Sequence, residues 1–278
     1  MPFLDERRQF EQELDAFYAT YPSDVSHILR EMDEASAQHP EWSPYRRKAM
    51  VYEIIAAQCP VKVFRHFPFY FEINTGKQRT DLGGGGIGGW MKRQPFGERL
   101  THSGVAWWEP CQANGLSSGW PVLDDNHHCI GNDNVLRHGL NGLTRQAEER
   151  LSSASTQKER AFLESAMAGQ RALIAIAARF ADEAERLSAE EKEPEIRERL
   201  QRIAGTARRV PAQPPATFYE ALNTLLFMRE VTQALECNGN SVLGHLDRIL
   251  WPYYERDLAE GRVTRAEAKD LSSASFWP

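Results

Sequence analysis

The feature that most constrains this chain is a series of amphipathic helical segments that carry their own start signals. The pattern Thr-x-x-Glu occurs at residues 156–159, 217–220 and 264–267, each time before a segment with helical apolar spacing. In this pattern the threonine hydroxyl and the glutamate carboxylate satisfy free backbone N–H groups of the first turn. The sequence therefore predicts that residues 141–278 are predominantly helical.

The apolar stripes of these segments indicate their buried faces. Segment 190–202 is mostly charged, which predicts a surface helix with Pro194 in the first turn, where proline is tolerated. We expect a short strand at 241–244 and a helix at 246–260 that Pro252 kinks or delays. The two longest stripes consist of Leu163, Ala166, Gln170, Leu173, Ala177 and Phe180, and of Ala221, Leu225, Met228, Thr232 and Leu235.

Two further zones precede this region, and we treat residues 1–278 as a single region. Residues 1–60 have helical spacing interrupted by prolines. Residues 61–140 hold more than half of the 19 glycines and many of the seven tryptophans, with aromatic and β-branched runs at 61–64 and 67–73. This zone predicts ordered loops with short strands. The expected fold class is mainly α with a few short β-strands.

Composition excludes several classes of function. The formal net charge of −6 argues against nucleic-acid binding, which needs a cationic surface. No apolar run approaches the roughly 20 residues that cross a bilayer, and the first residues lack a signal core, so we expect no membrane association. The four cysteines are too few and too irregular for a disulfide scaffold, which indicates a cytoplasmic protein.

The residues alone offer several candidate sites. The glycine run 83–89 contains G-x-G-x-x-G, but no strand or long helix flanks it, which favours a loop over a dinucleotide site. Segment 124–129 concentrates possible zinc ligands, yet adjacent ligands rarely converge on one ion, so we predict no metal site. Residues 107–109 could form a carbohydrate platform or pack in the core, and residues 238–241 are typical of a turn.

Several segments resemble the pyruvate formate-lyase-like glycyl radical enzymes. The match comprises the F-x-E-A-L and L-E-S-N-G-H-S patterns at 218–241, Y-P-Y-Y-x-x-D-L-x-x-G-R-x-T at 251–264, and R-x-V-P-A at 208–212. His127 and residues 134–142 resemble the pattern G-H-x-x-P-D-Y-x-x-V-L-x-x-G-L-x-G. The shared order and spacing carry the resemblance, which extends from about residue 125 to 270.

This resemblance implies the N-terminal part of a ten-stranded β/α barrel, incomplete in this chain. In the family, a glycyl radical takes hydrogen from a cysteine, and the resulting thiyl radical attacks a small-molecule substrate. A separate iron–sulfur activase that uses S-adenosylmethionine installs the radical. The resemblance also implies a homodimer, and no cofactor held by this chain itself.

Neither radical signature, G-C-x-E or R-V-x-G-[YF], occurs in the sequence. We therefore expect an N-terminal fragment of a radical lyase or dehydratase that is inactive alone. One alternative is a non-catalytic binding or complementing subunit, which would dock to a chain carrying the missing loops. Another is an unrelated helical scaffold with an accidental likeness.

The resemblance places three residues at the substrate: Asn240, Ser241 and His127. Two departures from the family pattern accompany them. Asn240 stands where the family has histidine, and an amide cannot act as an acid or base near neutral pH. Residues 130–132 read Ile-Gly-Asn where the family often has Pro-Asp-Tyr. No catalytic residue is predicted.

Overall fold

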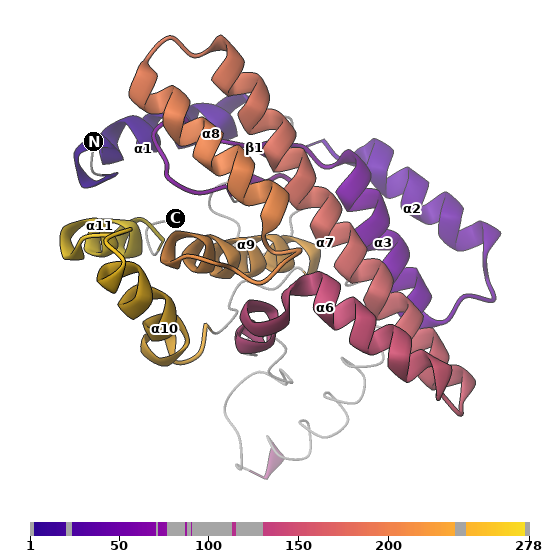
Figure 1. The fold of residues 1–278 in the computed structure, drawn as a ribbon. Coiled ribbons are helices and arrows are strands. Elements are labelled where there is room, and N and C mark those ends of the chain that lie inside the picture. Colours follow the sequence, from indigo (N-terminus) through magenta and orange to yellow (C-terminus); the bar gives the residue numbers. More distant parts are fainter. Residues whose placement is uncertain are drawn as a thin grey trace.

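The computed structural model describes residues 3–20, 24–70, 72–76, 87, 90, 113–114, 130–236 and 243–275. Helices dominate this part of the chain, as Figure 1 shows. Their bounds are α1 Phe3–Thr20, α2 Ser26–Gln38, α3 Pro44–Gln58, α6 Asn132–Ser152, α7 Gln157–Glu190, α8 Pro194–Arg209, α9 Phe218–Glu236, α10 Leu246–Ala259 and α11 Arg265–Ser275, and the strands are β1 Val61–Lys62 and β2 Glu72–Ile73. The predicted mainly helical class with short strands is confirmed for these residues.

The long helix α7 organises one side of the molecule. It packs along α8, α3 and α6, while α9 lies beneath this layer and contacts α10 and α11 (Figure 1). Arg179 of α7 donates hydrogen bonds of 2.8 and 2.7 Å to the carbonyl oxygens of Ala56 and Cys59, at the end of α3. A cation there also suits the negative end of the helix dipole. Helix α3 is thus fixed to α7 at its C-terminus.

All three predicted capping signals are confirmed. The threonine hydroxyls of Thr156, Thr217 and Thr264 each accept a hydrogen bond from the backbone N–H three residues later, at 3.1, 3.1 and 3.2 Å. The glutamate carboxylate of each pattern accepts a hydrogen bond from a backbone N–H just before the helix. Removing such a cap typically costs about 1 kcal/mol of stability. The starts of α7, α9 and α11 are therefore encoded locally.

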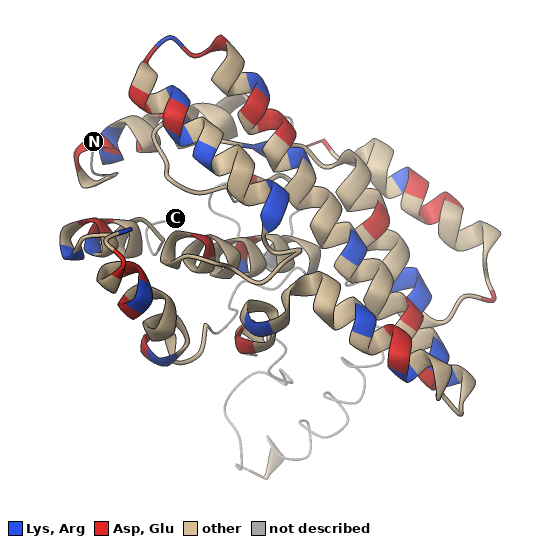
Figure 2. Ribbon diagram, viewed as in Figure 1, with Lys and Arg blue, Asp and Glu red and all other residues tan. Residues whose placement is uncertain are grey.

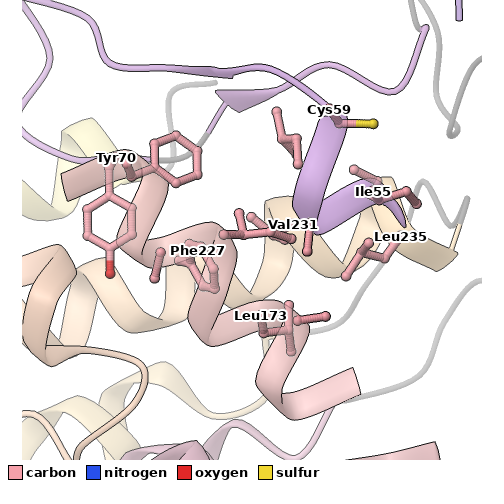
Figure 3. Close-up of a cluster of buried hydrophobic side chains, with 14 of the residues drawn as sticks. Ile55, Cys59, Tyr70, Leu173, Phe227, Val231 and Leu235 are labelled. Atoms are coloured by element: carbon pink, nitrogen blue, oxygen red, sulfur yellow. The ribbon is translucent and has the colours of Figure 1, made fainter. Parts of the chain in front are cut away.

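Helix α9 is buried on nearly all sides, which its apolar stripe alone did not predict. Its C-terminal half contributes to a core cluster shared with α2, α3, α7 and α8. Figure 3 shows this cluster, with Phe227, Val231 and Leu235 of α9 gathered near Leu173 of α7, Ile55 of α3 and Cys59, which directly follows α3. The N-terminal half of α9 belongs to a second cluster with α1, α10 and α11.

An aromatic segment joins the two clusters. The strands β1 and β2 pair antiparallel, with Val61 opposite Ile73, and the residues between them carry buried rings. Phe67 stacks on Phe10 of α1 at 4.4 Å between ring centroids. Tyr70 donates its hydroxyl hydrogen to the carbonyl of Val210, at the end of α8. This segment therefore connects α1 to the centre of the molecule.

Carboxylates of α1 hold the same segment from outside. Both oxygens of Glu13 accept backbone N–H groups, from Arg65 at 3.2 Å and from His66 at 3.1 Å. Glu6 is 3% exposed and forms an ion pair of 2.6 Å with Arg199 of α8. Charged residues elsewhere lie along the helices and in the turn between α7 and α8 (Figure 2).

Two local expectations need correction. The strand expected at 241–244 is absent where the structure describes it, because residues 243–245 are irregular and Gly244 has a φ of 82°. Helix α10 begins at Leu246, so Pro252 lies inside it and does not delay its start. Within the described residues, strands cover only 61–62 and 72–73, and residues 67–70 turn their rings into the core, as suits an irregular run that contains Pro68. Within the described ranges, no helix is long and apolar enough to cross a membrane.

We expect Phe180→Ala to lower the free energy of unfolding by about 3–5 kcal/mol, because it empties a fully buried site on α7. The matched control is Phe162→Ala on the same helix, where the ring is 52% exposed and the loss should be below about 1 kcal/mol. Urea unfolding followed by circular dichroism measures both. Equal losses for the two variants would contradict the assigned core.

Candidate functional site

The three predicted substrate residues, Asn240, Ser241 and His127, lie outside the described residues. The same holds for segment 124–129, for residues 107–109 and for the glycine run apart from Ile87. The residues that follow two of these segments, at 130–132 and 243–245, are described. The site is therefore built from α6, the start of α10 and the turn after α8.

Helix α6 begins next to the predicted site. Gly131 precedes it in the left-handed region, with a φ of 72°. Asn132, its first residue, is 1% exposed, and its Nδ2 donates a hydrogen bond of 3.2 Å to the carbonyl oxygen of Leu243. This bond joins residues 111 positions apart in the sequence. It links the chain just after His127 to the chain just after Ser241.

The Oδ1 atom of Asn132 is buried and has no hydrogen-bond partner among the residues that the structure describes. A buried acceptor left unpaired costs about 1–3 kcal/mol, so such groups in native proteins call for an explanation. This amide bonds to Leu243, which follows the second predicted substrate segment in the sequence. Sequence reasoning noted the departure from tyrosine at this position but did not predict the asparagine's role, since a bond over such a separation leaves no local signal.

Two of the motifs that carry the resemblance contact each other through a glycine. Gly139 kinks α6 with φ 63° and ψ 167°, a conformation open essentially only to glycine. A Cβ atom there would lie 2.6 Å from the carbonyl oxygen of Ala212. The kink lets Leu140 and Asn141 donate backbone hydrogen bonds of 2.9 and 3.0 Å to Pro211 and Ala212. The glycine therefore allows the backbone of α6 to lie close to the backbone of residues 211–213.

A buried carboxylate connects two further motifs. Asp257 of α10 is 2% exposed, and its Oδ2 accepts the backbone N–H of Phe218, the first residue of α9, at 2.7 Å. Its Oδ1 accepts the Nε and Nη2 groups of Arg262 at 3.0 and 2.7 Å. Tyr253 of the same motif donates to the carbonyl of Leu136 in α6 at 3.2 Å. These motif residues hold helices together.

The described residues carry no activated nucleophile or metal centre. Burial raises the pKa of the Cys59 thiol to about 12, so it stays protonated at neutral pH. Burial likewise raises the pKa of Tyr219 to about 12. Among the residues that the structure describes, no group of three or more His, Cys, Asp or Glu side chains could hold a metal ion.

The sequence profile of the family described as pyruvate formate lyase-like matches residues 94–277. The chain belongs to this family. Isethionate sulfite-lyase of Nitratidesulfovibrio vulgaris is 32% identical over 146 residues, covering 50% of this chain and 18% of that protein. Trans-4-hydroxy-L-proline dehydratase of Clostridioides difficile is 26% identical over 189 residues, covering 66% of this chain and 24% of that protein. The resemblance to glycyl radical enzymes is thereby confirmed.

Solved structures agree at the level of the fold. A structure concerned with 1,2-propanediol dehydration in Roseburia inulinivorans matches with a TM-score of 0.68 and 21% identity, over 96% of this chain and 36% of that one. A glycyl radical enzyme from Archaeoglobus fulgidus matches with a TM-score of 0.66 and 20% identity, over 95% and 39%. The chain spans less than a quarter of the curated relatives and less than half of these solved chains.

We expect Gly139→Ala to destabilise the protein by about 1–3 kcal/mol from backbone strain alone, with the contact to Ala212 adding to the loss. The matched control is Gly205→Ala in α8, where an added Cβ meets nothing within 4 Å. That change should stabilise the helix by about 0.5–1 kcal/mol. Chemical unfolding of both variants gives the comparison, and a neutral Gly139→Ala would refute the close approach.

Stability should fall as the pH rises from 9 toward 12. The raised pKa values of Cys59 and Tyr219 mean that the unfolded chain ionises first, at ordinary values near 9.0 and 10.0. The stabilisation that these buried neutral groups give the folded state is therefore complete below pH 9. It is lost as the pH rises to about 12. Urea unfolding at several pH values measures this, and Cys59→Ala should reduce the slope. An unchanged slope would contradict the burial of the thiol as the cause.

Proposed function

We propose that this chain forms the N-terminal part of a glycyl radical enzyme that acts on a small molecule by lyase or dehydratase chemistry. Family membership supports the class of chemistry. The names of the matched relatives concern isethionate and trans-4-hydroxy-L-proline, both small polar molecules. The proposal includes a cytoplasmic location and the homodimer that the resemblance implies.

The observation that carries the proposal is the bond between Asn132 and Leu243. It joins the ends of the two segments in which the resemblance places His127 on one side and Asn240 and Ser241 on the other. Gly139 fixes α6 to the turn after α8, and Asp257 fixes α10 to the start of α9, so the helices that carry this bond are held in place. A rigid frame of this kind is what a substrate site needs, because small displacements of binding groups cost rate.

Within this proposal, Asn240 and Ser241 bind the substrate through hydrogen bonds. The Asn240 amide offers hydrogen-bond donors and an acceptor, and the Ser241 hydroxyl can donate or accept a hydrogen bond. Neither group exchanges a proton near neutral pH, so proton transfer at this position is not part of the proposed role. His127 is the one residue of the three that can change its charge in the physiological range.

The radical chemistry itself belongs to other parts of the assembly. The glycyl radical, installed by an S-adenosylmethionine-dependent iron–sulfur activase, would supply hydrogen-atom abstraction in the full-length enzyme. This chain carries neither the G-C-x-E nor the R-V-x-G-[YF] signature. We therefore propose that it has no turnover alone, and that the residues described here bind and orient substrate within the longer protein.

Sequencing the coding DNA beyond the codon for Pro278, in all three frames, tests the proposal. We expect both radical signatures to follow in order. The restored chain, treated anaerobically with the activase encoded beside it, should then show a glycyl radical doublet by electron paramagnetic resonance, and the 278-residue chain should not. An intact stop codon followed by an unrelated gene would overturn the proposal.

On the restored chain, Ser241→Ala should raise the KM for substrate by about tenfold, because one hydrogen bond to the substrate is lost. The matched control is Ser273→Ala on α11, whose hydroxyl bonds only within its own helix, to the carbonyl of Lys269. Steady-state kinetics measure both. Equal KM values for the two variants would remove Ser241 from the substrate site.

A further inference from the structure

A groove lies between α8 and α11, on the side of α9 away from Asn132 and Leu243. It has a volume of about 880 Å³. Helices α1, α8, α9 and α11 and the segment at 66–68 all contribute to its walls. Pockets that hold small organic ligands fall in the range of about 300–1,000 Å³. We call this feature the α8–α11 groove.

The floor of the groove is apolar. Phe3 of α1, Pro68, and Tyr219 of α9 line it, with Val263 and Leu271 on the side of α11. Phe3 and Tyr219 are otherwise packed in the second core cluster, so the floor is fixed by the fold. The Tyr219 hydroxyl is already used, because it donates to the carbonyl oxygen of Pro68. The floor therefore offers apolar surface to a ligand.

Most of the charged groups around the floor are committed to partners in the protein. Glu6 is ion-paired with Arg199 at 2.6 Å. Asp270 accepts the backbone N–H groups of Phe3 and Leu4 at 2.7 and 3.1 Å, and so caps the start of α1. Glu267 caps α11 through Thr264, and Arg262 holds the buried Asp257. These groups shape the groove and are not free to bind a ligand's charge.

Arg202 differs from all of these groups. Its guanidinium carbon lies 3.6 Å from the centroid of the Tyr219 ring, on the groove side of α8. Within the described ranges Arg202 has no hydrogen bond to an acceptor and no close ion pair, although Glu198 stands one turn earlier on the same helix. The pKa of Glu267 is lowered first by its hydrogen bonds with Thr264 and to a smaller degree by the positive charge of Arg202. A stacked guanidinium keeps its planar fork of N–H donors available, and this fork matches a carboxylate.

We propose that the α8–α11 groove binds a small organic monocarboxylate, with its carboxylate on Arg202 and its apolar body over the floor. The rim carries Glu195, Glu198 and Glu267, which disfavour a second negative charge. Phosphate esters and dicarboxylates are therefore the less favourable ligands. The proposal does not depend on the substrate residues of the proposed function.

Calorimetric titration of the 278-residue chain with phenylacetate tests the proposal, with phenylacetamide as a neutral probe of the same shape. We expect phenylacetate to bind and phenylacetamide to bind at least about tenfold more weakly, because only the anion uses the guanidinium. Ala266→Trp, which adds bulk in the groove and leaves Arg202 in place, should abolish phenylacetate binding. Near-ultraviolet circular dichroism confirms that each variant is folded.

Arg202→Gln should weaken phenylacetate binding by about tenfold or more. The matched control is Arg171→Gln on α7, which removes the same charge at an exposed position whose nearest carboxylate, on Glu148, is 3.7 Å away. Binding that is unchanged in Arg202→Gln, or reduced equally in both variants, would overturn the proposal. So would the absence of phenylacetate binding to the unaltered chain, or equal binding of the neutral probe.

Discussion

The burial of α9 on nearly all sides is the constraint on which the rest of the structure depends. The two core clusters meet at this helix, the C-terminal half lying in one and the N-terminal half in the other. A helix that is apolar all round must be covered from every direction. Helices α3, α6, α10 and α11 and the strand β2 all contact it. The positions of these elements are thus tied to how they cover α9.

The described motif residues that identify the family mainly join helices to one another. Gly139 allows two backbones to approach, and Asp257 receives a backbone N–H group from α9 and a guanidinium from Arg262. A buried carboxylate is tolerated only when it is paired and hydrogen-bonded, as this one is. Among the described residues, the likeness to glycyl radical enzymes is therefore largely a likeness of framework.

Much of the helical structure could be predicted from the sequence, because its signals are local. Thr156, Thr217 and Thr264 mark helix starts through bonds that span three residues, and proline positions such as Pro194 follow the same short-range logic. Apolar spacing likewise identified the C-terminal part of the buried face of α7, at Leu173, Ala177 and Phe180, but only one side of α9.

The remaining features could not be predicted in this way, because they depend on contacts between distant segments. The irregular path of residues 67–70 follows from rings that pack against α1 and α9 instead of forming a ladder. Asn132 gained its partner only when α6 and the start of α10 were brought together. The charged sequence of α8 predicts a surface helix, and it does not indicate that Arg199 forms an ion pair with a buried glutamate on α1. The substrate residues themselves were inferred from the resemblance alone.

The cap that Asp270 places on α1 has a consequence for biosynthesis. Helix α1 is made well before α9, α10 and α11, and the carboxylate that satisfies its first N–H groups is made 267 residues after Phe3. Its aromatic face also packs in the cluster that contains α9, α10 and α11. Contacts of such long sequence separation form slowly, because loop closure must precede them. The aromatic face of α1 therefore stays uncovered in the nascent chain until these later helices have been made.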